Sequence, residues 1–211
     1  MNEPLSEDDV NARANEKARK RKAARDKILA TKTREKGLLM VHTGRGKGKS
    51  TAAFGLVVRA IGNGMKVGVV QYVKGKWETG ERVVLEHFAD QVCIRTMGEG
   101  FTWETQDRER DINAAKAAWA VSCEMIEACR GPEPEYDLLL LDELNIVLRY
   151  DYLDLDEVVG VLKHKPADLH IVVTGRNAKE GLIDAADMVT DMTMVKHHFK
   201  AGVKAQRGIE F

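Results

Sequence analysis

Cysteine is scarce in this chain of 211 residues. Its three cysteines, Cys93, Cys123 and Cys129, are odd in number and form no C-x-x-C pair. Disulfide frameworks and cysteine-based zinc sites need paired or closely spaced cysteines, so neither is predicted. Free thiols are typical of a reducing compartment, and we therefore expect a cytoplasmic protein.

Long apolar runs and an excess of one charge are also absent. No run approaches the roughly 18 apolar residues of a transmembrane helix, and the acidic start MNEPLSEDDV lacks the apolar segment of a signal peptide. The 33 basic residues balance 33 acidic ones, so the net charge indicates no class of partner. With 44% hydrophobic residues, the chain can bury a sizeable core, and its length fits one α/β domain with an appendage.

A residue set for nucleophilic catalysis is missing too, since no Ser/His/Asp or Cys/His combination stands out. His197 and His198 are adjacent near the end of the chain. Neighbouring side chains point apart in an extended segment. We therefore expect these two imidazoles not to chelate one metal ion, but to face solvent or to make hydrogen bonds.

The sequence does contain a phosphate-binding pattern, at residues 38–51, LLMVHTGRGKGKST. An apolar run leads into a glycine-rich turn and then a helix-like stretch, which is the order of a P-loop. The backbone N–H groups of such a loop form an anion cradle, Lys49 would reach the outer phosphates, and the Ser50 hydroxyl would ligate Mg²⁺. Thr43 replaces the first glycine of the pattern, and an ordinary glycine-rich turn is the alternative interpretation.

A second chemical landmark is the run of four leucines at 138–141, which is followed by Asp142 and Glu143. This predicts a buried parallel strand of the Walker B type, whose terminal acid holds the Mg²⁺ shell. Glu143 would either activate water or help to hold the metal. Lys74 and Arg176 each follow another predicted strand, at the sheet edge where ligands bind. Each is a candidate phosphate contact, or else an exposed loop residue.

The alternation of strand and helix patterns predicts an α/β fold, a RecA-like P-loop NTPase with a mostly parallel sheet flanked by helices. We expect this domain to span residues 37–211. We expect a long helix that has Thr105 as its N-cap and ends at Arg130. We also expect a short helix that has Asn177 as its N-cap and ends at Asp184. A last core strand is expected at Met188–Val195, and a ligand-edge loop with a short strand after it.

Residues 1–36 stand apart as a basic arm. From Arg13 to Lys36 there are 11 Lys/Arg and 3 Asp/Glu, and few residues could form a core. The arm is helical or partly disordered, and three roles remain open: a solvated segment, a lid over an anionic ligand, or a nucleic-acid-binding arm. It has no interleaved aromatic residues to stack on bases, which counts against the last role.

The stretch MGEGFTW at 97–103 places Phe101 and Trp103 two residues apart. In an extended loop both rings lie on the same side. They would either anchor the loop in the core or form a flat apolar wall against a planar ligand.

Together these stretches resemble the ATP:corrinoid adenosyltransferases, the P-loop family that includes cob(I)alamin and cob(I)yrinic acid a,c-diamide adenosyltransferases. The resemblance extends from about Gly37 to Phe211, and the basic arm matches least. It is carried by TGRGKGKSTAAFG (43–55), MGEGFTW (97–103), LLLDELN (139–145), VVTGR (172–176) and VKHHFKAGVKAQRGIEF (195–211). A P-loop alone is common to many families, but its combination with the FTW loop and this C-terminal stretch is specific.

The resemblance implies transfer of the 5′-deoxyadenosyl group of ATP to Co(I) of a corrinoid, with release of tripolyphosphate. Cobalt is then the nucleophile, so the missing catalytic set is explained. Mg²⁺ (or Mn²⁺) would be held by Ser50 and Glu143, beside Asp142. The residues that would bind the triphosphate, with Lys49 also stabilising the leaving group, are Gly44, Arg45, Gly46, Lys47, Gly48, Lys49, Ser50 and Thr51.

The resemblance further implies that Phe101 and Trp103 lie against the corrin and keep the lower axial ligand off cobalt, which eases reduction of Co(II). A reduced flavoprotein as electron donor, a homodimer and a lid role for the basic arm are implied as well. The preferred corrinoid stays open between cobyrinic acid diamide, cobinamide and cobalamin. The alternatives from other classes are a RecA-like NTPase acting on nucleic acid and a small-molecule kinase or nucleotide-dependent module.

Overall fold

The computed structural model describes residues 6–73, 79–97 and 107–210. The chain divides into two compact units, Met1–Glu35 and Lys36–Phe211. The described part of the first unit is dominated by helix α1, Glu7–Ala30, none of whose side chains is buried. Its start is fixed by Ser6, whose hydroxyl accepts a hydrogen bond from the Asp9 N–H at 3.2 Å, and by acidic residues in the first turn.

The second unit is built on a six-stranded sheet with the order β3-β2-β4-β5-β1-β6, in which every neighbouring pair is parallel. The P-loop strand β1 and the acidic strand β4 are separated by β5. This confirms the predicted P-loop α/β fold. The strands are β1 Leu39–Thr43, β2 Val67–Gln71, β3 Val92–Thr96, β4 Leu138–Asp142, β5 His170–Thr174 and β6 Met188–Asp191.

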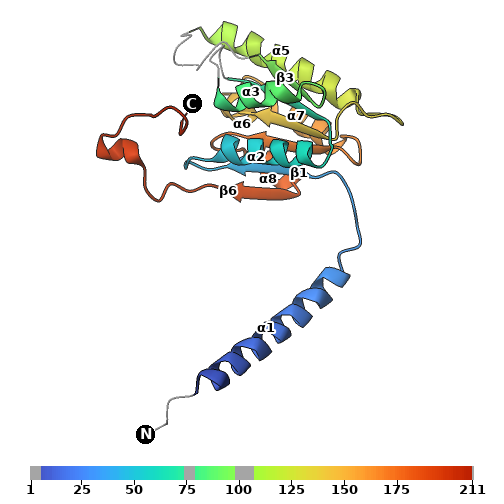
Figure 1. Ribbon diagram of the computed structural model, residues 1–211. Helices are drawn as coiled ribbons and strands as arrows, with labels where there is room; N and C mark the ends of the chain where they lie inside the picture. Colours follow the sequence, from blue (N-terminus) through green and yellow to red (C-terminus); the bar gives the residue numbers. More distant parts are fainter. Residues whose placement is uncertain (1–5, 74–78, 98–106, 211) are drawn as a thin grey trace. The chain divides into compact units, whose positions relative to one another are not determined.

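Helices cover both faces of this sheet, because its central strands are apolar on both sides (Figure 1). In β1, Leu39 and Val41 join one core cluster, whereas Met40 joins the other. The Met40 side is covered by α2 Lys49–Gly62 and α3 Gly80–Leu85. The other side is covered by α5 Arg108–Glu127, α6 Leu144–Arg149, α7 Leu155–Lys163 and α8 Glu180–Ala185. The described residues also include two short 3-10 helices, η1 Glu86–Phe88 and η2 His198–Ala201.

Two expected helix starts are wrong. Helix α5 is capped by Asp107, whose side chain accepts the Arg110 N–H at 3.1 Å, rather than by Thr105. Helix α8 is preceded by Lys179, while Asn177 has φ +55° and so belongs to the turn before the helix. In both cases a residue nearer to the helix takes the extended conformation that an N-cap position requires.

The end of the chain also differs from expectation. Strand β6 stops at Asp191 and all its residues are exposed, because it lies at the edge of the described sheet, next to β1. The described tail contains η2 and turns but no strand. His197 is extended, but the chain turns into η2 at His198, and the rings of His197 and His198 stack at 4.8 Å instead of pointing apart. Among the described residues, no helix is both long and apolar enough to cross a membrane.

Candidate functional site

The predicted strand–loop–helix unit is present at the carboxyl end of β1. The strand is buried throughout, the loop occupies residues 44–48, and α2 begins at Lys49. Gly44 and Gly48 have φ values of +99° and +104°, a region that side chains other than glycine rarely adopt. These two glycines therefore shape the loop that follows β1.

Thr43 has a structural role at the position where the P-loop pattern calls for glycine. It is the last residue of β1 and is buried, and its hydroxyl accepts the Ala178 N–H at 2.9 Å. This hydrogen bond ties the start of the P-loop to the segment that follows β5. Thr43, which stands in place of the glycine, thus connects two loops at one edge of the sheet.

The segment after β6 lies against the P-loop. The Gly46 N–H donates to the Met192 carbonyl at 2.6 Å. A Cβ atom at Gly46 would lie 2.6 Å from the carbonyl oxygens of Met192 and Thr193, and one at Gly44 would lie 2.3 Å from a carboxylate oxygen of Asp191. Close approach of the chain at 191–193 therefore requires glycine at both positions, which the sequence pattern alone did not indicate.

Lys49 lies in a group of charged side chains at the start of α2. It is half-buried, and its Nζ donates to the Gly46 carbonyl. Burial lowers the pKa of the Lys49 ammonium, the neighbouring charges of Arg176 and Lys47 lower it further, and Glu143 and Asp191 act in the opposite direction. Arg176 therefore acts electrostatically on the P-loop lysine.

The acidic end of β4 is organised by Thr174 at the end of β5. The Thr174 hydroxyl donates to Asp142 at 2.7 Å and accepts the Glu143 N–H at 2.9 Å. Asp142 is fully buried, and Glu143 has φ +68°, a strained conformation for a residue with a side chain. The predicted strand with terminal acids is confirmed, and Thr174 is a site residue that sequence analysis did not single out.

The remaining predicted residues fall into three groups. Ser50 is half-buried in the first turn of α2, whereas Thr51 beside it and the loop residues Arg45 and Lys47 are exposed. Lys47 pairs with the Glu210 carboxylate from the tail. Lys74, Phe101 and Trp103 lie outside the described residues.

The parallel order of β4, β5 and β1 brings hydroxyl, carboxylate and cationic groups to one edge of the sheet. Lys49, Arg176 and the loop N–H groups suit a polyphosphate. The oxygens of Ser50, Asp142 and Glu143 are of the type that Mg²⁺ prefers. Such a site can bind a nucleotide–metal complex and stabilise charge that develops on phosphate oxygens.

Comparison with known proteins places this arrangement in context. The family model of the ATP:corrinoid adenosyltransferase BtuR/CobO/CobP matches residues 35–211. A corrinoid adenosyltransferase of Pseudomonas aeruginosa is 51% identical over 211 residues, which is 100% of both chains. One of Sinorhizobium sp. is 55% identical, covering 99% of this chain and 95% of the relative. The corrinoid adenosyltransferase CobA of Salmonella typhimurium is 43% identical over 88% of this chain and 91% of its own.

Proposed function

Since this chain belongs to the ATP:corrinoid adenosyltransferase family and adenosylates corrinoids with ATP, we propose that its P-loop binds the triphosphate as a leaving group that departs whole. In the proposed reaction, the electron pair of Co(I) attacks the ribose C5′. The C5′–O bond breaks, and its electron pair leaves with tripolyphosphate. No residue has to remove a proton, so the reaction needs no Ser/His/Asp or Cys/His set.

The observation that carries this proposal is the position of Lys49. Its ammonium lies at the loop, beside the charges of Arg176 and Lys47. These cations and the loop N–H groups offset the negative charge that grows on the departing oxygens. Half-burial strengthens that interaction, because the local dielectric is lower than in water. Arg45 and Thr51 complete the proposed triphosphate site, and Lys74 is proposed to contact it from the loop after β2.

We propose that Mg²⁺ is held by Ser50 and Glu143, with Asp142 beside them. The fit rests on donor chemistry, since all three supply oxygen and the Thr174 hydrogen bonds fix the acids at the end of β4. When bound, the ion would neutralise part of the charge on the leaving triphosphate. Glu143 is then a metal-holding residue rather than a base for water.

For the corrinoid side we propose roles that family membership supports. The first is that Phe101 and Trp103 contact the corrin and keep the lower axial ligand off cobalt. A reduced flavoprotein would supply the electrons, and the basic arm would act as a lid. The enzyme itself would be a cytoplasmic homodimer. Cobyrinic acid diamide, cobinamide and cobalamin are the candidate substrates, and comparing initial rates on the three would rank them.

The product test is direct. The enzyme is mixed with ATP, Mg²⁺ and chemically reduced corrinoid, and the products are separated. We expect tripolyphosphate and a light-sensitive alkylcobalt species in equal amounts. ADP or orthophosphate formed without corrinoid, or stimulated by DNA or RNA, would instead support a nucleic-acid-dependent NTPase.

The aromatic role is tested with Trp103→Ala. We expect ATP binding to be retained and adenosylation from Co(II) to slow sharply, because the axial ligand would no longer be displaced. Co(I) supplied chemically bypasses that step and serves as the internal control, so its adenosylation should be much less affected. Equal losses in the two assays would contradict the proposed role.

A further inference from the structure

We propose that His197, His198 and Glu210 form a binding site for one divalent transition-metal ion of the Zn²⁺ type. This site differs from the oxygen donors assigned to Mg²⁺, and the proposal does not depend on the function proposed above. Two imidazoles with one carboxylate form a donor set typical of Zn²⁺ and related ions.

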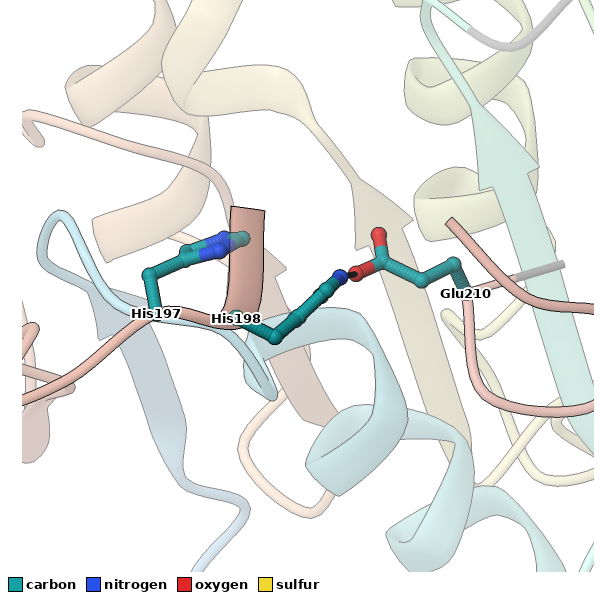
Figure 2. A group of neighbouring side chains, drawn as sticks. All are labelled: His197, His198 and Glu210. Carbon is teal, nitrogen blue, oxygen red and sulfur yellow. Dashed lines mark ion pairs between the residues drawn. The ribbon is translucent and has the colours of Figure 1, made fainter. Parts of the chain in front are cut away.

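The three side chains are gathered closely enough to share an ion. One ligand atom from each lies within 4.8 Å of the others. Figure 2 shows the His198 ring directed at the Glu210 carboxylate, with Nε2 at 3.2 Å from Oε1. A tetrahedral ion with bonds of about 2.0–2.1 Å holds neighbouring ligand atoms roughly 3.4 Å apart. The His198–Glu210 pair therefore has the separation of two ligands on one ion.

The backbone explains how residues so far apart in the sequence meet. The 3-10 helix that begins at His198 turns the chain, and the rings of His197 and His198 stack with an interplanar angle of 27°. Gly202 and Gly208 have φ values of +76° and +78° and allow the chain to reverse. The tail thereby brings Glu210 back to the two imidazoles.

Glu210 is prepared as a ligand. Its side chain is only 14% exposed, and its Oε2 accepts from Lys47 Nζ, while Oε1 faces His198. A carboxylate that ligates a metal is commonly held by such an outer hydrogen bond.

His197 is the third and weaker ligand. Its Nδ1 accepts the Phe199 N–H at 3.2 Å, which caps η2. Ligation through Nδ1 would cost this hydrogen bond, whereas ligation through Nε2 would keep it. We expect His198 and Glu210, which already lie at 3.2 Å from each other, to contribute most of the affinity. An ion bound here would tie the tail together and, through Lys47, link it to the P-loop.

The test is titration of the full chain with Co²⁺, without ATP or corrinoid, followed by visible ligand-field absorption and then by Zn²⁺ competition. We expect one high-affinity ion per chain that excess Mg²⁺ does not displace. His198→Ala and Glu210→Gln should each weaken binding on the order of 10- to 100-fold, and His197→Ala by less. His87→Ala is the matched control, since this histidine lies outside the group, on η1, and should bind like wild type.

A second measurement does not depend on variants. Crystals of the wild-type chain soaked in Zn²⁺ should give an anomalous-scattering peak between His198 and Glu210. A peak only elsewhere, no saturable binding, or wild-type affinity in both His198→Ala and Glu210→Gln would overturn the proposal. Unfolding midpoints measured in EDTA identify any variant with a damaged fold, and His198→Gln then replaces His198→Ala.

Discussion

At the scale of single residues, Thr174 connects two strands of the sheet through its side chain. One hydroxyl donates to the buried Asp142 and accepts from the Glu143 backbone, and so connects β5 with the acidic end of β4. Asp142 is fully buried, which makes each of its hydrogen bonds important. Thr174 therefore helps to set the position of both acids at the end of β4.

Replacing Thr174 with Val keeps the shape but removes this hydroxyl. We expect the free energy of unfolding to fall by about 1–3 kcal/mol, because a buried carboxylate loses a hydrogen-bond donor. Urea unfolding measures the change, and the adenosylation rate should fall with it. Thr174→Ser is the matched control, since it keeps the hydroxyl and should recover most of both losses. A Val variant as stable as wild type would contradict this role.

At position 46, the available space rather than the backbone angle limits the size of the side chain, since the φ of Gly46 is not positive. In Gly46→Ala the methyl group would lie 2.6 Å from two backbone carbonyl oxygens, so the segment 191–193 must move. We expect a loss of about 1–3 kcal/mol in unfolding free energy and weaker ATP binding. Gly55→Ala is the control, because nothing lies within 4 Å of its added methyl. It should stabilise α2 by about 0.5–1 kcal/mol. Equal effects of the two substitutions would refute the close-packing argument.

At the scale of elements, the start of β1 is joined to β5 through His170. The Leu38 N–H donates to His170 Nδ1 at 3.2 Å. Burial lowers the pKa of this imidazole, and the neighbouring charge of Lys165 lowers it further. Protonation would turn the acceptor into a donor facing the Leu38 N–H. The link between these strands therefore requires the neutral ring.

This link predicts a pH dependence of stability. The unfolded chain takes up the His170 proton near its ordinary pKa of about 6.5, whereas the folded chain does so only at lower pH. The contribution of His170 is thus complete above about pH 6.5 and is lost as the pH falls towards the folded pKa. Asn at this position cannot titrate, and its carbonyl can still accept the Leu38 N–H. Between about pH 7 and pH 5, wild type should lose unfolding free energy more steeply than His170→Asn; parallel curves would contradict this.

Local patterns were enough to predict the elements that carry chemistry. Apolar runs ending in glycine or acid located β1 with its P-loop and β4 with Asp142. The contacts of Thr174, and of the chain at 191–193 with Gly46, were not predictable. They join segments far apart in sequence, and they depend on strand order, which periodicity does not contain.

The end of the chain also shows that local sequence patterns do not predict tertiary contacts. A period-based prediction made β6 a core strand, but its place at the edge of the sheet leaves it exposed. His197 and His198 were expected to diverge because an extended backbone was assumed, and a single 3-10 turn reverses that conclusion. Local conformation of a polar tail depends on its tertiary partners, here Lys47 and Glu210.

At the scale of the whole molecule, the chain is a catalytic unit with a separate basic helix. The family match at residues 35–211 nearly coincides with the unit Lys36–Phe211. Lys36 belongs to that unit, since its ammonium pairs with Asp187, and the Gly37 N–H donates to Ala167 at 2.6 Å. A truncation that spares the fold must therefore begin no later than Lys36.

The chain Lys36–Phe211 tests what the arm contributes. Because α1 has no buried side chain, we expect this shortened protein to unfold at the same midpoint as the full chain and to bind ATP equally well. If the arm is a lid, its loss should raise KM for the corrinoid and leave KM for ATP unchanged. A full-length variant with Lys20, Arg21 and Lys22 changed to Gln separates charge from length, since it keeps the helix but removes part of its positive surface. Unchanged corrinoid kinetics in both proteins would refute the lid, and a lower unfolding midpoint would show that residues 1–35 belong to the folded core.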